Sequence, residues 1–269
     1  DPGPRVQNFC RELSAEWKGR RAARVPILPE RVTASFVEDA VEPETLSFPL
    51  GIAKQSLEPC MLRITARPIH FILSRGGDSG FLGAFAALLE GKLGDGFRAL
   101  DGDGRLDGCC ARLSAGEDGL NQTVTEIFDE LVRRHNEAKA LREAGNPAPV
   151  YPPKVYLVSG LSQVLSKLDP DRQDKLHQLL ERCTVPLAVF FIMADRADAL
   201  SSYAIKPWFK HLSPLENGVW LGDGAAEQYQ LKLHSDRSLY AKIGENFGYL
   251  AKDGAPVPMK LLEREENDG

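Results

Sequence analysis

Three short runs of apolar residues constrain the fold of this chain more than any other feature. They span residues 69–74, 154–159 and 187–194, and segments with helical periodicity separate them. Apolar runs of six to eight residues that alternate with helices are typical of parallel strands covered on both faces. We therefore expect an α/β fold with a mostly parallel sheet and helices on both of its faces.

Other segments extend this alternating pattern. Further strands are predicted at residues 47–53, 60–66, 97–101 and 218–222, and helices at residues 80–93, 120–144 and 170–183. The last apolar stretch, residues 248–262, reads as a hairpin because Asp253-Gly254 supplies the turn residues that tolerate a positive φ. These elements place most of the chain in one domain.

The first part of the chain has a different character. Residues 5–24 carry Val6, Phe9, Leu13 and Trp17 at spacings of three and four, which predicts an amphipathic helix. The proline-marked stretch 26–30 is stiff and extended. We therefore divide the chain into a linker helix with an extended interdomain segment (1–46), a main domain (47–262) and a charged tail (263–269).

Composition excludes several classes of function. The chain has 33 basic and 38 acidic side chains, a net charge of −5 that disfavours nucleic-acid binding. Its five cysteines form no C-x-x-C pair and its histidines are scattered, so we expect reduced thiols and no metal site. No leader is visible, and the longest apolar runs are about half of the ~20 residues that cross a bilayer, so we expect no membrane insertion of this segment.

The turn after residues 69–74 has the context of a phosphate-binding loop. An apolar strand, a glycine-rich loop and a helix follow one another here, as in the pattern G-x-x-x-x-G-K-[ST]. With Gly77 as the first glycine, Leu82 stands at the second glycine, Gly83 at the lysine and Ala84 at the hydroxyl position. The degenerate loop comprises Gly77, Asp78, Ser79, Gly80, Phe81, Leu82, Gly83 and Ala84. The alternative is an ordinary turn of an α/β domain.

The second nucleotide-binding motif, an acid that binds the metal ion, is also missing from its expected position. A metal-binding acid should end a later apolar strand, but the strand 154–159 ends in Ser159-Gly160. The nearest lysines, Lys92 and Lys154, are not placed to substitute, and Arg75 is either an anion contact or a solvated loop residue. We therefore expect no catalytic residues and no cofactor, the alternative being weakly bound Mg-ATP.

Several segments together carry a resemblance to a known family. They are residues 48–52, 68–73, 154–158, 187–194 and 218–222 with the closing hairpin, preceded by Trp17-Lys18-Gly19 and the segment 26–30. In order and spacing they resemble an FtsK/SpoIIIE-type ATPase domain, specifically the last of the tandem ATPase domains of the type VII secretion coupling ATPases (EssC/EccC). The resemblance implies a RecA-like, P-loop NTPase-type core and a cytoplasmic domain of a membrane-anchored bacterial protein.

The resemblance also implies a function and partners. It implies a role in recognising or moving secreted helical-hairpin (WXG100-like) proteins, preceding ATPase domains in the same polypeptide, and a six-membered ring or tandem assembly. Because the nucleotide positions depart from the family pattern, we expect a catalytically inert or impaired domain that acts in substrate recognition and regulation. The alternative is a weakly active ATPase or an FtsK-type DNA translocase module.

One aromatic pair is a candidate for partner binding. Trp208 and Phe209 follow Pro207, and exposed aromatic side chains are natural anchors for an apolar peptide. The alternative is that both rings belong to the core.

Overall fold

The computed structural model describes residues 3–16, 27–76, 80–210, 212 and 215–265. Within these ranges ten strands form one sheet in the order β2-β1-β10-β9-β8-β3-β7-β6-β4-β5. The strands are β1 (Ser47–Ala53), β2 (Pro59–Arg63), β3 (Ile69–Ser74), β4 (Phe97–Asp101), β5 (Leu113–Ala115), β6 (Lys154–Ser159), β7 (Val189–Arg196), β8 (Gly218–Leu221), β9 (Phe247–Lys252) and β10 (Ala255–Leu261).

The sheet has a parallel part and an antiparallel part. From β8 through β3, β7, β6 and β4 to β5 all neighbours are parallel, whereas the pairs on the β2 side of β8 are antiparallel. This arrangement confirms the predicted mostly parallel α/β fold. It places β3, the strand before the glycine loop, in the interior of the sheet between β8 and β7.

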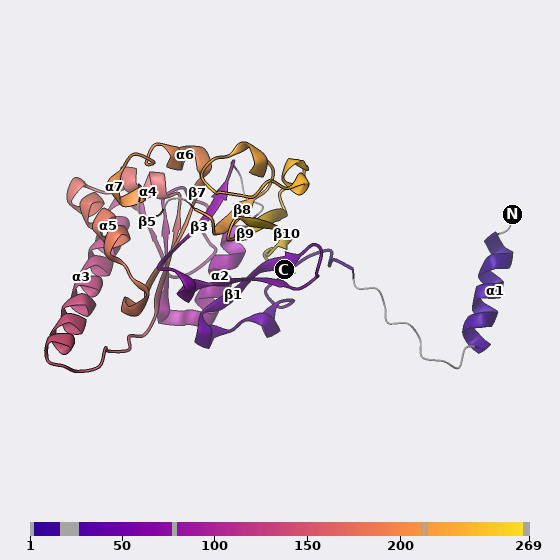
Figure 1. The fold of residues 1–269 in the computed structure, drawn as a ribbon, viewed down its shortest axis with the longest axis horizontal. Helices are drawn as coiled ribbons and strands as arrows, with labels where there is room; N and C mark the ends of the chain where they lie inside the picture. The colour runs from indigo at the N-terminus through magenta and orange to yellow at the C-terminus, as the bar shows by residue number, and fades with distance from the viewer. Residues whose placement is uncertain (1–2, 17–26, 77–79, 211, 213–214, 266–269) are drawn as a thin grey trace.

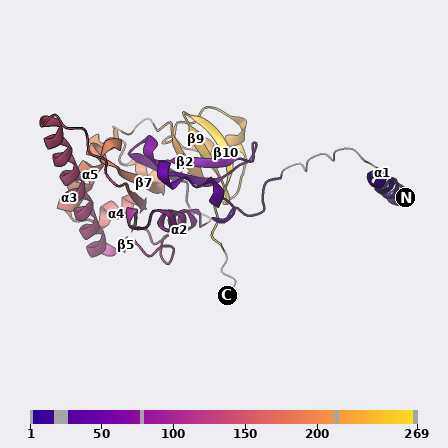
Figure 2. The same cartoon turned by 90° about the horizontal axis from the view of Figure 1, so that it is seen from below.

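Helices cover both faces of the sheet (Figures 1 and 2). They are α2 (Phe81–Leu93), α3 (Gly116–Glu143), α4 (Leu161–Lys167), α5 (Pro170–Arg182), α6 (Ala197–Ser201) and α7 (Pro207–Lys210), whereas the remaining helix, α1 (Gly3–Glu16), does not pack on the sheet. Phe71 and Leu73 of β3 join a buried cluster with α3, α4 and α5, whereas Ile72 joins a second cluster with α2. The alternation of side chains along each strand therefore builds two cores.

Most predicted elements are confirmed, and the differences lie at chain ends and short segments. The strand predicted at residues 60–66 ends at Arg63, because residues 64–66 turn into a 3₁₀ helix. The short strand β5 and the helix α4 were not predicted. The hairpin of β9 and β10 turns at Asp253 and Gly254, whose φ angles are 50° and 79°.

The N-terminal part is built in two pieces. No residue of α1 is buried, and α1 lies apart from the sheet in Figure 1. In contrast, the segment expected to be an extended linker contributes Val32, Val37 and Leu46 to the core cluster of α2. No helix in the described part of the chain combines the length and apolar character that crossing a membrane requires.

Candidate functional site

The carboxyl ends of the parallel strands bring the two predicted nucleotide positions to one edge of the sheet. In the β3–β7 pairing Ser74 lies opposite Arg196, and in the β6–β7 pairing Ser159 lies opposite Ala194. Asp101, the last residue of β4, lies opposite Ser159. Ligands of open α/β sheets bind at this edge, so it is the candidate functional site.

In the described part of the phosphate-loop position, residues 80–84, the start of α2 is packed against the core. Gly77, Asp78 and Ser79 lie outside the described residues. Gly80, with φ of 81°, precedes α2, and its carbonyl oxygen accepts a hydrogen bond of 3.0 Å from the Ala84 N–H. Phe81, Leu82, Gly83 and Ala84 are buried in the first turn of α2, and the Phe81 ring stacks on Phe85 at 5.7 Å. This turn therefore presents apolar side chains to the core.

Cys109 occupies the space that a side chain at Gly83 would need. A Cβ at Gly83 would lie 2.6 Å from the Cys109 sulfur, a distance that Cβ atoms essentially never show, so a side chain there would require the sulfur to shift. Cys109 belongs to the loop between β4 and β5, which runs over the N-terminal turn of α2. The place of the phosphate-binding lysine is thus filled by another part of the same chain.

The second nucleotide position is filled in the same way. Ser159 is fully buried, and its hydroxyl donates a hydrogen bond of 2.7 Å to Asp103 Oδ1. Gly160 has a φ of 66°, and a Cβ there would lie 2.8 Å from Asp103 Cγ. Asp103 therefore packs directly against the end of β6, where a metal-binding acid would stand.

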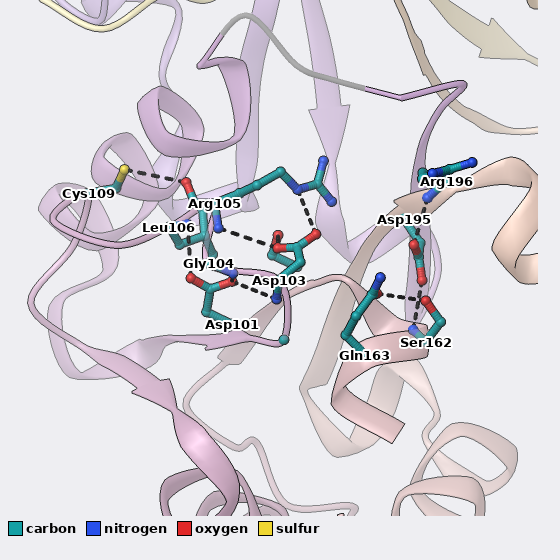
Figure 3. Close-up of polar contacts among 12 residues, drawn as sticks. Asp101, Asp103, Gly104, Arg105, Leu106, Cys109, Ser162, Gln163, Asp195 and Arg196 are labelled. Carbon is teal, nitrogen blue, oxygen red and sulfur yellow. Dashed lines mark hydrogen bonds and ion pairs between the residues drawn. The ribbon is translucent and has the colours of Figure 1, made fainter. Parts of the chain in front are cut away.

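Asp101 and Asp103 shape the loop that brings Cys109 to α2 (Figure 3). Asp101 is buried, and its carboxylate accepts bonds from Gly104 N–H at 2.8 Å, Leu106 N–H at 3.0 Å and Asp103 N–H at 3.3 Å. Burial raises the pKa of the Asp101 carboxyl above its ordinary value. The carboxylate is a structural anchor for the turn.

The pKa of the Asp103 carboxyl is shifted in the opposite direction. Burial alone would raise the pKa of its carboxyl, but the Ser159 hydroxyl and the Arg105 guanidinium outweigh burial and hold the pKa below its ordinary value. Arg105 Nε donates to Asp103 Oδ2 at 2.7 Å. The ionised carboxylate therefore has its partners within the loop and β6.

A third carboxylate at this edge is also engaged by the chain. Asp195 of β7 is buried, and it accepts bonds of 2.7 Å from the N–H groups of Ser162 and Arg196, as Figure 3 shows. Within the described ranges, no three His, Cys, Asp or Glu side chains are grouped so that they could hold a metal ion.

The described residues do not fit Mg-ATP. The lysine and hydroxyl positions are Gly83 and Ala84, the first of them closed by Cys109, and the acid position is a serine whose hydroxyl is bonded to Asp103. Lys92 pairs with Glu38 at 2.8 Å, and Lys154 donates to the Asp95 carbonyl oxygen at 2.8 Å, so both lysines are engaged with other parts of the chain.

Three acidic residues that shape this edge were not identified from the sequence. They are Asp101, Asp103 and Asp195. The available signal was their position at or just past the carboxyl ends of the apolar strands β4 and β7, in the stretches Asp-Gly-Asp-Gly and Ala-Asp-Arg. That position predicts the carboxyl edge of a parallel sheet.

A shallow cavity lies beside the site. It has a volume of about 440 Å³ and is lined by Arg75 and Arg196, among others. Arg75 Nη1 forms an exposed ion pair of 2.6 Å with Glu227, and Arg196 pairs with Asp198. Both guanidinium groups are therefore engaged with carboxylates of the same chain, and Arg75 is a solvated loop arginine.

The two residues of the predicted aromatic pair, Trp208 and Phe209, have different outcomes. Phe209 is buried and packs edge-to-face against Phe71 with ring centroids 6.0 Å apart, so it belongs to the core and is not a surface anchor. The side chain of Trp208 lies outside the described part of the structure, so its role in binding stays a prediction.

A second, larger groove lies along α3. It has a volume of about 930 Å³, and it lies between the C-terminal half of α3, the loop before β6 and the end of α5. Phe128, Leu131, Val132 and Pro186 give it an apolar floor, and Lys139, Arg142 and Arg182 stand among its polar lining residues. Sequence reasoning did not find this groove, because its residues come from three separated segments.

Comparison with known proteins identifies the class of fold. No protein-family profile matches this sequence, and no curated protein matches it. Solved structures share its fold over nearly the whole chain, and this shared fold is RecA-like.

The similar structures include ATPase domains of EssC and EccC. EssC (ATPases 2 and 3) from Geobacillus thermodenitrificans is 19% identical with a TM-score of 0.77, over 97% of this chain and 50% of that one. Thermomonospora curvata EccC (ATPases 2 and 3) in complex with a signal sequence peptide is 15% identical with a TM-score of 0.65, over 97% and 48%. The cytoplasmic domain of the Thermomonospora curvata type VII secretion ATPase EccC is 16% identical with a TM-score of 0.64, over 97% and 31%. This chain thus spans half or less of each.

Proposed function

We propose that this chain is an FtsK-like domain of a type VII secretion motor that has lost ATP hydrolysis and acts in substrate recognition and regulation. One observation carries the proposal: the position of the phosphate-binding lysine is closed by Cys109. The bond between Ser159 and Asp103 at the metal-acid position supports it. The shared fold of EssC and EccC supports the assignment to a secretion motor.

The proposed assembly follows from the same likeness. The similar chains contain more than one ATPase domain, and this chain corresponds to about half of two of them. We place it beside preceding ATPase domains of the same polypeptide, on the cytoplasmic side of a membrane-anchored bacterial protein, in a ring or tandem assembly.

Recognition of a secreted helical-hairpin protein is the proposed positive function. The groove beside α3 has apolar side chains flanked by polar and basic ones, the surface that suits one face of an amphipathic helix. A helical segment would present anchors at spacings of three and four to Leu131 and Val132. An EccC structure solved with a signal sequence peptide supports this class of ligand.

The test of recognition compares two exposed apolar positions. Fluorescent C-terminal peptides of secreted helical-hairpin proteins are titrated against wild type, Val132→Lys in the groove and Ile205→Lys, another exposed apolar residue. We expect wild type and Ile205→Lys to bind equally and Val132→Lys at least tenfold more weakly. No binding by wild type would refute recognition, and equal binding by all three would move it away from the groove.

The test of inertness is steady-state phosphate release by the whole chain with Mg-ATP. We expect no release above the protein-free control. Release by wild type would favour the alternative of a weakly active ATPase. A gel shift with duplex DNA at physiological salt addresses the translocase alternative, and the net charge of −5 predicts no sub-micromolar binding.

A further inference from the structure

The C-terminal segment 262–265, here called the C-terminal arm, is bonded to the segment that enters the domain, residues 30–36, here called the entry segment. The Glu263 N–H donates to the Val32 carbonyl oxygen at 2.7 Å, and Arg31 Nη2 donates to the Arg264 carbonyl oxygen at 2.8 Å. Arg31 also pairs with the Glu263 carboxylate at 3.4 Å, and the Ser35 N–H donates to Glu265 at 3.0 Å. Hydrogen bonds and an ion pair therefore join the two segments.

The C-terminal arm also reaches the loop that closes α2. Arg264 Nη2 donates a hydrogen bond of 3.0 Å to the Gly108 carbonyl oxygen, next to Cys109. The Arg264 Cδ lies 3.9 Å from the position that a Cβ of Gly83 would take. The side chain of Arg264 thus lies over the same place that Cys109 fills.

The loop between β4 and β5 has a root next to Asp101 and a tip at Gly108 and Cys109, and different contacts hold the two parts. Its root is bonded to the buried carboxylate of Asp101 through Gly104 and Leu106. Its tip is held by the Cys109 N–H bond to the Leu106 carbonyl oxygen at 3.0 Å and by Arg264. Because hydrogen bonds near the surface contribute little net free energy, the tip is the end that can open without unfolding the root.

We propose that the C-terminal arm couples the position of the entry segment to the closure of α2 by the Cys109 loop. Displacement of residues 30–36 by a preceding domain would shift Arg264 and release Gly108 and Cys109 from the first turn of α2. Return of the entry segment would restore the Arg264 bond and close the loop. This coupling does not depend on whether the domain hydrolyses ATP.

The reactivity of Cys109 reports the coupling. The intact chain is alkylated with N-ethylmaleimide, and the rate at each cysteine is followed by peptide mass spectrometry. Burial raises the pKa of the Cys60 thiol to about 11 and that of Cys183 to about 12, so both react slowly while the fold is intact. They serve as internal controls for unfolding.

Three variants distinguish coupling from local contact. Arg264→Ala removes the bond to Gly108, Arg31→Ala removes bonds between the entry segment and the arm, and Arg63→Ala at the end of β2 is the surface control. We expect the first two to raise the Cys109 rate roughly three- to tenfold, the range for losing one exposed hydrogen bond, with no change in the control. Slow labelling of Cys60 and Cys183 must persist in all three.

Two outcomes would overturn the proposal. An unchanged Cys109 rate in Arg264→Ala would show that the arm does not hold the loop closed. An increase in Arg264→Ala without one in Arg31→Ala would show a local contact that the entry segment does not control. Phosphate release by wild type would refute inertness and leave this labelling result unaffected, so the two proposals fail separately.

Discussion

The sulfur of Cys109 lies where a side chain at Gly83 would begin, 2.6 Å from the Cβ position. This contact explains why a residue without a side chain stands at position 83 in the first turn of α2. It also predicts that the two positions are energetically coupled.

Gly83→Ala should destabilise the protein when Cys109 is present and not when Cys109 is alanine. The added methyl group gains up to ~1 kcal/mol of helix propensity but overpacks the contact by about 1–3 kcal/mol. We expect a coupling free energy of about 1 kcal/mol or more in a double-mutant cycle measured by urea unfolding. Gly91→Ala in the same helix, where a Cβ meets nothing within 4 Å, is the matched control and should stabilise.

Additive effects of Gly83→Ala and Cys109→Ala would contradict this account of the loop.

Restoring the lysine should not restore catalysis. Gly83→Lys alone should not create an ATPase, since Ala84 and Ser159 still leave a metal ion without its protein ligands.

Restoring an acid at the end of β6 should be costly. Ser159→Asp removes the hydroxyl that donates to Asp103 and buries a second carboxylate beside it. We expect a loss of about 3 kcal/mol in the free energy of unfolding, against about 1 kcal/mol for Ser159→Ala. Urea unfolding measures both. In an Asp103→Asn background the extra cost of Ser159→Asp should fall, and an equal cost in both backgrounds would rule out charge repulsion.

Much of the fold followed from sequence, because the apolar strands are strong local signals. The strands β3 and β6 have the predicted bounds, and the turn at Asp253-Gly254 is confirmed. The loss of the lysine, hydroxyl and acid positions was read from the sequence, and the structure places the ends of β3 and β6 at one sheet edge. What fills them was not, because Cys109 reaches Gly83, and Asp103 reaches Ser159, through contacts between distant segments that have no local pattern.

The loss of folding stability at low pH should depend on Glu130 in α3. The hydrogen bond from Arg133, together with Arg134, lowers the pKa of Glu130 to about 2. Arg134 is fully buried and also donates to the Leu187 and Ala188 carbonyl oxygens. Because the folded pKa lies below the unfolded one, this stabilisation is present near neutral pH and is lost as pH falls from about 5 toward 2.

Thermal unfolding across this pH range tests the assignment. Glu130→Gln should lower Tm near neutral pH and reduce the fall of Tm between about pH 5 and pH 2, since the titrating partner of Arg134 is gone. If Tm of Glu130→Gln fell as steeply with pH as that of wild type, other carboxylates would dominate the loss of stability in acid.

Calorimetric titration of the intact chain with Mg-ATP tests the central claim, that the nucleotide positions are filled by the chain itself. Losing one lysine at about 4 Å from a phosphate removes ~1–4 kcal/mol, and the missing metal ligands add to this, so no binding heat is expected with about 100 μM nucleotide. A dissociation constant in the low micromolar range would contradict the account, because Cys109 and Asp103 would then have to leave the positions they occupy.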